Sequence, residues 1–173
     1  MSNGSSAAGI DPRSPRFGAS ITSVLLAIAL VLTLTAGAEP AGVLLLALIA
    51  LLFAWGGFAG ITRHPYGALF RRVIRPRLDP PTALEDPAAP TFAQRVGFVI
   101  TALGVLLALV GIPAAAPIGA ALALVAAVLN SVFDICIGCL LYVWLLRVGV
   151  IRSRDSASAA HSTPRGAPES AAE

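Results

Sequence analysis

Four long apolar runs dominate the pattern of hydrophobic and polar positions along the chain. They cover residues 17–36, 41–61, 96–112 and 118–146. A helix needs about 20 apolar residues to cross roughly 30 Å of hydrocarbon. The first two runs have this length, the third is at the short end, and the fourth is long enough to tilt or protrude. The pattern therefore predicts four membrane-spanning helices.

The segments between the runs predict how these helices are connected. Residues 37–40 and 113–117 are tight joints of the kind that link antiparallel helices, whereas the middle loop between the second and third runs is longer and polar. We therefore predict an all-α fold, an integral membrane four-helix bundle formed by one domain over residues 17–147. The flanking residues 1–16 and 153–173 are rich in Ser, Ala, Gly and Pro, and we expect both segments to be disordered.

The middle loop contains one periodic stretch. Its apolar positions recur at helical spacing, at Tyr66, Leu69, Phe70, Val73 and Ile74. Arg71, Arg72 and Arg75 fall on the opposite face. This pattern predicts a short amphipathic helix that lies in the membrane interface, with its apolar stripe toward the bilayer and its arginines toward water.

Composition and charge support a membrane location. The chain is 57% hydrophobic and 12% charged, whereas a soluble domain has about a quarter charged residues. All the basic residues are arginines, which flank the apolar runs or lie in the middle loop, and the two tight joints contain none. By the positive-inside rule, we expect both termini and the middle loop to lie in the cytoplasm. The expected partner of the arginines is the lipid bilayer, not nucleic acid.

Cys136 and Cys139 form a CxxC motif inside the fourth run and are the only cysteines of the chain. This spacing suits a dithiol that cycles to a disulfide, so the pair is a candidate catalytic redox site. The alternative is packing, because a buried cysteine behaves as a small hydrophobic residue. In the middle of a continuous helix the pair would lack the helix N-terminus that activates thiols in redox proteins. Cys139 would also lie about 12 Å inside the membrane, counted along the helix from Arg147.

A metal site is not expected from this motif. A four-ligand zinc site needs two more ligands, and the chain has no second cysteine pair. Its only histidines are His64 and His161, which lie far apart in the sequence. The chain also has no phosphate-binding glycine loop and no nucleophile elbow, which argues against a conventional kinase or hydrolase.

Asn130 and Asp134 are the polar residues expected inside the membrane. They are four positions apart in the fourth run and would share one face of a continuous helix. A carboxyl group at that depth is costly and often marks a functional site. Alternatively, Asp134 holds helices together through a polar partner such as Asn130, or through an arginine. A small transporter that uses Asp134 is a further alternative, although a single carboxylate and no evident inverted repeat argue against it.

Arg63, His64 and Tyr66 follow the second run, where the chain leaves the membrane. We expect them to form an interfacial anchor, with Tyr66 at the level of the lipid head groups. The alternative is that His64 relays protons, since an imidazole titrates near neutral pH.

Several short motifs, in order along the chain, resemble one bacterial family. They are Gly9-Ile10-Asp11-Pro12-Arg13, Pro15-Arg16-Phe17, Arg63-His64-Pro65-Tyr66-Gly67, Arg75-Pro76-Arg77-Leu78, Leu84-Glu85-Asp86-Pro87, Phe92-Ala93-Gln94 with Gly97, and Asn130 with the CxxC. Together they resemble the bacterial integral membrane family of domain of unknown function 4395, over about residues 9–147. Its members often lie in genomes beside thioredoxin-like and sulfurtransferase-like genes.

The resemblance implies a bacterial inner-membrane protein. It also implies thiol or sulfur redox handling with a thioredoxin-like or sulfurtransferase-like partner. Four-helix membrane thiol oxidoreductases are a weaker analogy, because their CxxC on the last helix lies near the outer face beside a quinone. Here the pair is expected deeper and closer to the cytoplasm. We therefore expect no cofactor, with a quinone as the alternative. The competing interpretation is a structural or scaffolding membrane protein without chemistry, so whether the protein is an enzyme stays open.

Overall fold

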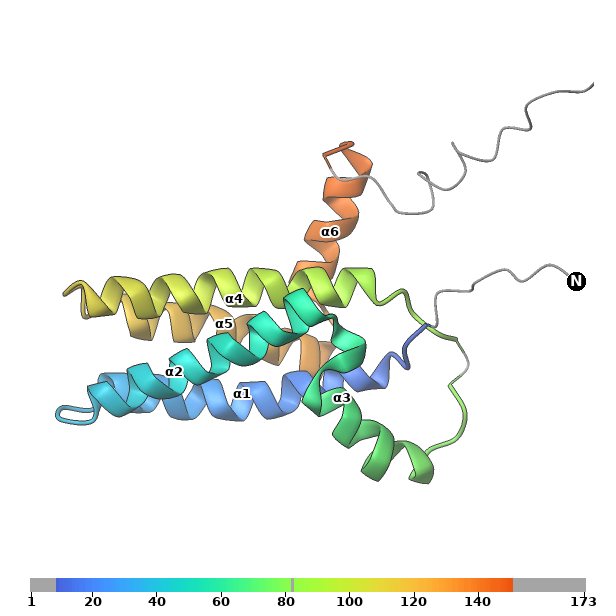
Figure 1. Ribbon diagram of the computed structural model, residues 1–173, viewed down its shortest axis with the longest axis horizontal. Helices are drawn as coiled ribbons and strands as arrows, with labels where there is room; N and C mark the ends of the chain where they lie inside the picture. The colour runs from blue at the N-terminus through green and yellow to red at the C-terminus, as the bar shows by residue number, and fades with distance from the viewer. Residues whose placement is uncertain (1–8, 82, 151–173) are drawn as a thin grey trace, which may run out of the picture.

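Four long helices form the body of the protein in the computed structural model, which describes residues 9–81 and 83–150 (Figure 1). They are α1 (Arg13–Leu34), α2 (Glu39–Ala54), α4 (Ala88–Leu109) and α5 (Ala115–Phe133). Helices α1 and α4 each pack against both α2 and α5. The α1–α2 and α4–α5 connections lie at one end, and the N-terminal segment, α3 and α6 lie at the other. The predicted all-α bundle is confirmed.

Four segments are long and apolar enough to cross a membrane. They are Arg13–Leu34, Glu39–Ala59, Ala88–Leu109 and Ala115–Phe133. This supports a membrane location, while the side that faces the cytoplasm stays a prediction. Helix α4 begins well before residue 96, because proline is tolerated in a first helical turn and Pro90 lies in that turn.

The expected continuous fourth helix is wrong. Helix α5 ends at Phe133, and a separate helix, α6 (Ile137–Arg147), runs across the direction of the other four (Figure 1). Asp134 adopts a left-handed conformation with φ of 61°, which aspartate tolerates better than most residues. The N–H of Ile135 then donates to the Leu129 carbonyl at 3.1 Å and closes the helix end. Helix α6 has 11 residues, or about 16 Å at the rise of an α-helix, so it is too short to span a bilayer.

Small residues allow the long helices to pack closely. A Cβ atom added at Gly104 of α4 would lie 3.3 Å from the Cα of Gly119 of α5 and 3.1 Å from the Ala115 carbonyl oxygen. Thr101, one turn earlier, is fully buried. Close backbone approach of this kind is a main source of helix association in lipid, where hydrophobic forces between helices are weak.

The N-terminal segment corrects the expectation of disorder through residue 16. Ile10 and Glu85 exchange two backbone hydrogen bonds of 2.9 Å, and α1 already begins at Arg13. These bonds and the ion pairs of Asp11 order residues 9–16 despite their composition. The rest of the two segments expected to be disordered, residues 1–8 and 153–173, lies outside the described residues.

The predicted middle-loop helix is present. Helix α3 (Pro65–Leu69) continues in wider turns through η3 (Phe70–Ile74). One part of the expectation is corrected, because Phe70 is buried at 2% exposure and packs on Phe17 of α1 with ring centroids 5.8 Å apart. Its large side chain therefore fixes the helix to the bundle instead of facing lipid. The position of this helix at the membrane interface stays a prediction.

Candidate functional site

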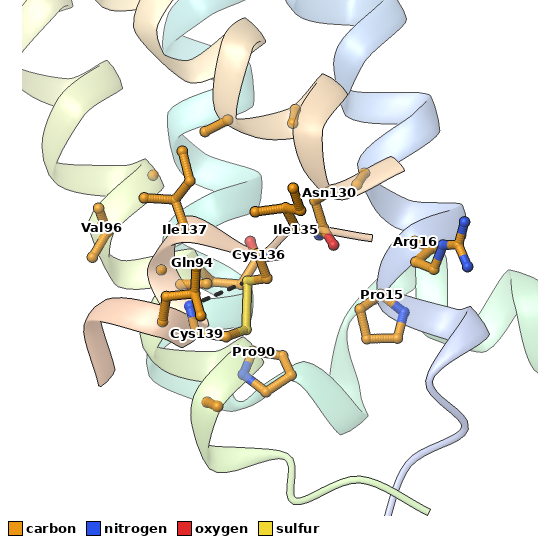
Figure 2. Close-up of a pocket in the computed structure, with 18 of the residues that line it drawn as sticks. Pro15, Arg16, Pro90, Gln94, Val96, Asn130, Ile135, Cys136, Ile137 and Cys139 are labelled. Carbon is orange, nitrogen blue, oxygen red and sulfur yellow. Dashed lines mark hydrogen bonds between the residues drawn. A yellow bond between two sulfur atoms is a disulfide. The ribbon is translucent and has the colours of Figure 1, made fainter. Parts of the chain in front are cut away.

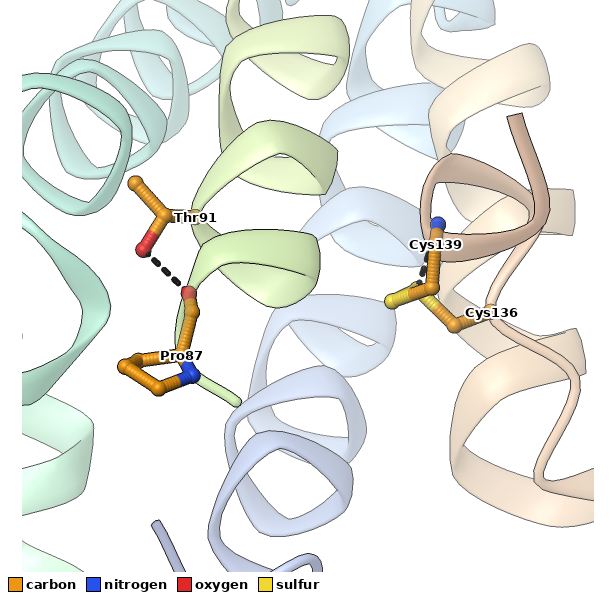
Figure 3. Close-up of a disulfide and its surroundings, with 4 residues drawn as sticks. All are labelled: Pro87, Thr91, Cys136 and Cys139. Carbon is orange, nitrogen blue, oxygen red and sulfur yellow. Dashed lines mark hydrogen bonds between the residues drawn. A yellow bond between two sulfur atoms is a disulfide. The ribbon is translucent and has the colours of Figure 1, made fainter. Parts of the chain in front are cut away.

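The break after α5 decides where the cysteine pair lies. Cys136 is the N-cap residue of α6, and its sulfur accepts a hydrogen bond from the Cys139 amide at 3.2 Å. The two residues are joined by a disulfide, with Cα atoms 5.1 Å apart (Figure 3). The expectation that the pair lies in the middle of a helix is therefore wrong. In general, the free N–H groups and the dipole at a helix N-terminus favour the thiolate form of a cysteine.

Gly138 sets the position of the pair against the bundle. A Cβ atom added at Gly138 would lie 2.5 Å from the Cβ and 2.6 Å from the Cα of Ala93 in α4. No side chain fits between the two helices at this point, so the first turn of α6 rests directly on α4. Both cysteines are partly exposed, which is the condition a reactive thiol needs.

A cavity of about 690 Å³ lies beside the cysteine pair (Figure 2). Helices α1, α4, α5 and α6 all contribute to its wall. Small residues leave this space, among them Ala19, Ala93, Gly97, Ala123 and Ala126. The wall extends along α5 as far as Leu122, so the cavity continues well into the bundle.

Gln94 of α4 provides a buried polar atom in the cavity wall. Its side-chain oxygen Oε1 is buried and has no hydrogen-bond partner among the described residues. The side chain packs on α2, because a Cβ atom at Gly56 would lie 2.9 Å from its Cγ. A buried oxygen without a donor is costly, so a hydrogen-bond donor that reached this oxygen would stabilise the site.

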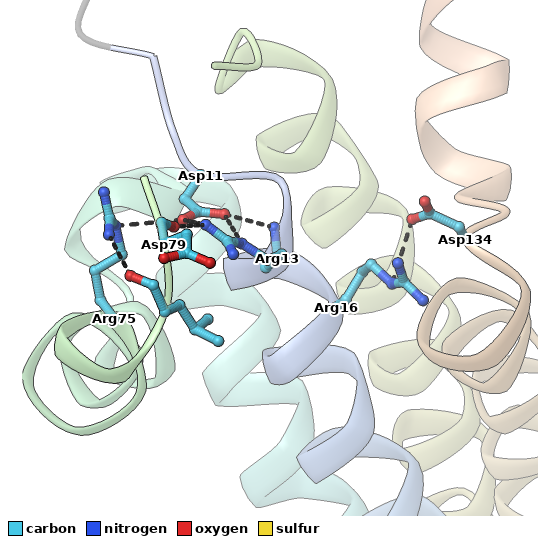
Figure 4. A network of polar contacts seen from close by, with 7 residues as sticks. Asp11, Arg13, Arg16, Arg75, Asp79 and Asp134 are labelled. Atoms are coloured by element: carbon cyan, nitrogen blue, oxygen red, sulfur yellow. Dashed lines mark hydrogen bonds and ion pairs between the residues drawn. The ribbon is translucent and has the colours of Figure 1, made fainter. Parts of the chain in front are cut away.

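Asn130 and Asp134 both line the cavity, but they do not share a helix face as expected. Asp134 lies in the left-handed turn beyond the last residue of α5, and its carboxylate pairs with the Nε of Arg16 in α1 at 3.4 Å (Figure 4). Of the partners expected for Asp134, the structure shows an arginine and not Asn130. The Asp134 side chain is 66% exposed, so the ion pair itself contributes little to stability.

A comparison with known protein families identifies the domain. The family model described as Domain of unknown function (DUF4395) matches residues 10–147. The chain belongs to this family. Searches of curated proteins and of solved structures found no match. The matched region of this DUF4395 chain runs from the N-terminal pairing of Ile10 to the last residue of α6, so it includes the cysteine pair and the whole cavity wall.

The interfacial triplet of the DUF4395 domain is placed differently from the expectation. Arg63 is exposed, but His64 is buried at 3% exposure. Its Nδ1 accepts from the Tyr66 amide at 3.3 Å, and its Nε2 lies 3.2 Å from the Leu52 carbonyl oxygen, to which it donates. The ring is therefore a neutral cap of α3 that ties it to α2. Because both nitrogens are engaged and the ring does not line the cavity, these contacts do not support the proton-relay alternative.

The buried His64 predicts a pH dependence of stability. Burial lowers the pKa of His64 below its ordinary value, and the hydrogen bond to Leu52 only partly opposes this. Such a group stabilises the fold above the unfolded pKa of about 6.5, and the stabilisation is lost as the pH falls below that value. We expect the midpoint temperature of thermal unfolding of the detergent-solubilised protein to decrease as the pH is lowered from about 7 to about 5. A His64→Gln variant should show a smaller change over the same interval; an equal change would contradict this origin.

A second polar cluster fixes the rim of the cavity. Asp11 pairs with Arg13 at 3.0 Å and with Arg75 of the middle loop at 3.4 Å, and Arg13 also donates to the Asp79 carbonyl at 2.9 Å (Figure 4). The hydrogen bond from Arg13 holds the pKa of Asp11 below its ordinary value. This cluster joins the N-terminal segment to the middle loop and so positions Pro12 at the cavity.

The structure also tests for a metal site and shows what the sequence missed. Within residues 9–81 and 83–150, no three His, Cys, Asp or Glu side chains come together as a metal site requires. The sequence did not reveal three residues of the cavity wall, namely Arg16, Ala93 and Gln94. All three belong to motifs that carry the family resemblance, but their roles depend on contacts between helices.

Proposed function

We propose that the protein is a membrane thiol–disulfide redox protein whose Cys136–Cys139 pair exchanges electrons with a thioredoxin-like partner. One observation carries the proposal: the break after α5 places Cys136 at the N-terminus of α6. That position favours the thiolate, which is the reactive form in disulfide exchange. The packing interpretation requires no such position.

The exchange follows from the arrangement of the two sulfurs. A thiolate of the partner attacks the Cys136 sulfur, the Cys136–Cys139 bond breaks, and Cys139 leaves as a thiolate. A second thiol of the partner then attacks the mixed disulfide and releases Cys136. The partner loses two electrons and becomes a disulfide, while the pair gains two electrons. The Cys139 amide, which donates to the Cys136 sulfur, stabilises the leaving thiolate in the second step.

The location of the pair supports access by a soluble protein. The pair follows the end of α5, at the same end of the bundle as the N-terminal segment and α3. The arginine distribution assigns this end to the cytoplasm, and the family resemblance suggests the bacterial inner membrane. A thioredoxin-like or sulfurtransferase-like protein at the membrane surface would therefore reach Cys136 without entering the hydrocarbon layer.

Thiol labelling tests the proposal directly, because the chain has two cysteines and both belong to the pair. Oxidised full-length protein in lipid nanodiscs is mixed with reduced thioredoxin, and free thiols are counted by the mass added by a maleimide. We expect both cysteines to become labelled. A thioredoxin that lacks its second cysteine should be trapped in a mixed disulfide with Cys136.

Cys136→Ser has no disulfide for the partner to attack, so it measures the background of the trapping reaction. The proposal fails if thioredoxin and dithiothreitol both leave the pair oxidised in the intact protein. It also fails if mass spectrometry of the trapped complex finds thioredoxin joined to Cys139 instead of Cys136.

A further inference from the structure

We propose that the cavity beside the cysteine pair binds a lipid-soluble quinone, which accepts electrons from the reduced pair. This inference rests on the proposed redox function and adds its second substrate. A dithiol that receives electrons from a soluble partner must pass them to an acceptor to act again. The shape, depth and lining of the cavity indicate what kind of acceptor fits.

The cavity reaches a depth that membrane-dissolved molecules occupy. Its wall on α5 extends from Asn130 back to Leu122, which corresponds to about 12 Å along the helix. This part of α5 belongs to a segment that is apolar enough to span the bilayer. Leu122 of α5 and Val143 of α6, which both line the cavity, are 57% and 41% exposed, so other side chains do not cover the wall at these two residues. We infer that a molecule dissolved in the acyl chains enters here, between α5 and α6.

The lining matches a flat apolar ring with oxygen atoms at its edge. Most of the wall is alanine, glycine and branched aliphatic residues, and Gln94 and Asn130 lie beside the cysteine pair (Figure 2). The charged residues of the wall are Arg16, Glu85, Asp86 and Asp134. Gln94 lines the cavity, and its Oε1, which has no partner among the described residues, lies against Gly56, just after α2. A rotation of the Gln94 amide would let this oxygen accept the hydrogen bond that a quinol hydroxyl donates. Asn130, which also lines the cavity, has an amide that donates to a quinone carbonyl. A small charged thiol fits less well, because its charges would lose their water in the apolar part.

The electron and proton balance closes with these groups. In the reduced pair, the S–H bonds of Cys136 and Cys139 break and the S–S bond between them forms. Two electrons and two protons pass to the quinone, and two O–H bonds form to give the quinol. Cys136 and Cys139 both line the cavity, so the sulfurs and the bound ring can come into contact without rearrangement of the helices.

The experiment uses reduced full-length protein in nanodiscs, freed of reductant and kept without oxygen. Duroquinone is the probe, because its fully methylated ring resists permanent addition of thiols. We expect both thiols to disappear as an equal amount of duroquinol forms. Ala126→Phe fills the cavity and should slow this oxidation about tenfold or more, because the ring no longer meets the sulfurs. The control is Val125→Phe, at a neighbouring residue that is 57% exposed and does not line the cavity.

Reduction of the same proteins by thioredoxin is measured in parallel. If the native protein exchanges with thioredoxin but duroquinone does not oxidise it, or oxidises it equally in Ala126→Phe, the quinone inference is wrong and the proposed function stands. If duroquinone oxidises the pair but thioredoxin does not reduce it, the proposed thioredoxin-like partner is wrong and the quinone inference stands. If Ala126→Phe fails to fold, Gln94→Leu tests the quinone inference in its place. This variant should raise the duroquinone concentration needed for half-maximal oxidation several-fold. An unchanged concentration would overturn the inference.

Discussion

A protein that retains only Cys136 should react with iodoacetamide about tenfold faster, or more, than one that retains only Cys139. Cys136 caps α6, and its sulfur accepts the Cys139 amide at 3.2 Å, so a negative charge on this sulfur is stabilised. Cys139 lies one turn inside the helix, where the sulfur is not in the capping position. The measurement compares the alkylation rates of Cys139→Ser and Cys136→Ser in nanodiscs at neutral pH.

The two variants are matched controls for each other. Serine is a good N-cap residue, so Cys136→Ser should preserve α6, and the two proteins differ mainly in which sulfur remains. Equal and slow alkylation of both would contradict the redox assignment. Cys136 and Cys139 would then be small hydrophobic residues in the cavity wall, as in the packing interpretation.

The four spans were predictable from the sequence because a chain that crosses a lipid bilayer can adopt few backbone structures. An apolar run of about 20 residues must satisfy its backbone hydrogen bonds internally, which a helix does. Tight joints such as residues 37–40 then force neighbouring spans to be antiparallel. The start of α4 was missed since the segment before residue 96 is rich in proline, although proline at the first turn is compatible with a helix.

The break after α5 was missed because hydropathy measures transfer into lipid and not backbone conformation. Ile135 and Ile137 continue the apolar run without interruption. The only local signals were Asp134, a residue type that tolerates the left-handed region, and Cys136, which takes the N-cap. A polar residue in an apolar run was interpreted as an intramembrane site, whereas it ends a helix.

The candidate site was predicted in part. The CxxC spacing identified Cys136 and Cys139, but the cavity depends on how α6 packs against α4 and α5, which no single segment of sequence contains. Gln94 looked like an ordinary residue near the start of a helix, and its buried oxygen is evident only with α2 in place. The break thus changes the meaning of the motif, because it moves the pair from the middle of a span to the N-terminus of a helix beside a cavity.

Gly138→Ala should destabilise the protein by about 1–3 kcal/mol, as overpacking of a filled contact generally does. The added methyl group would lie 2.6 Å from the Cα of Ala93, and a backbone atom cannot move aside as a flexible side chain can. Helix α6 must therefore shift away from α4, and the cysteine pair shifts with it. A loss of this size corresponds to roughly 2–4 °C per kcal/mol in the thermal midpoint of a chain of this length.

Gly18→Ala is the matched control for this substitution. Gly18 lies in α1, and an added Cβ would meet only the Tyr66 side chain at 3.6 Å, which is ordinary contact. Alanine should stabilise the helix there by up to about 1 kcal/mol through its higher helix propensity. Thermal unfolding of both variants in detergent shows whether Gly138→Ala lowers the midpoint temperature and Gly18→Ala raises it. If Gly138→Ala proves as stable as Gly18→Ala, the first turn of α6 does not rest on α4, and the pair is not held against the cavity by this contact.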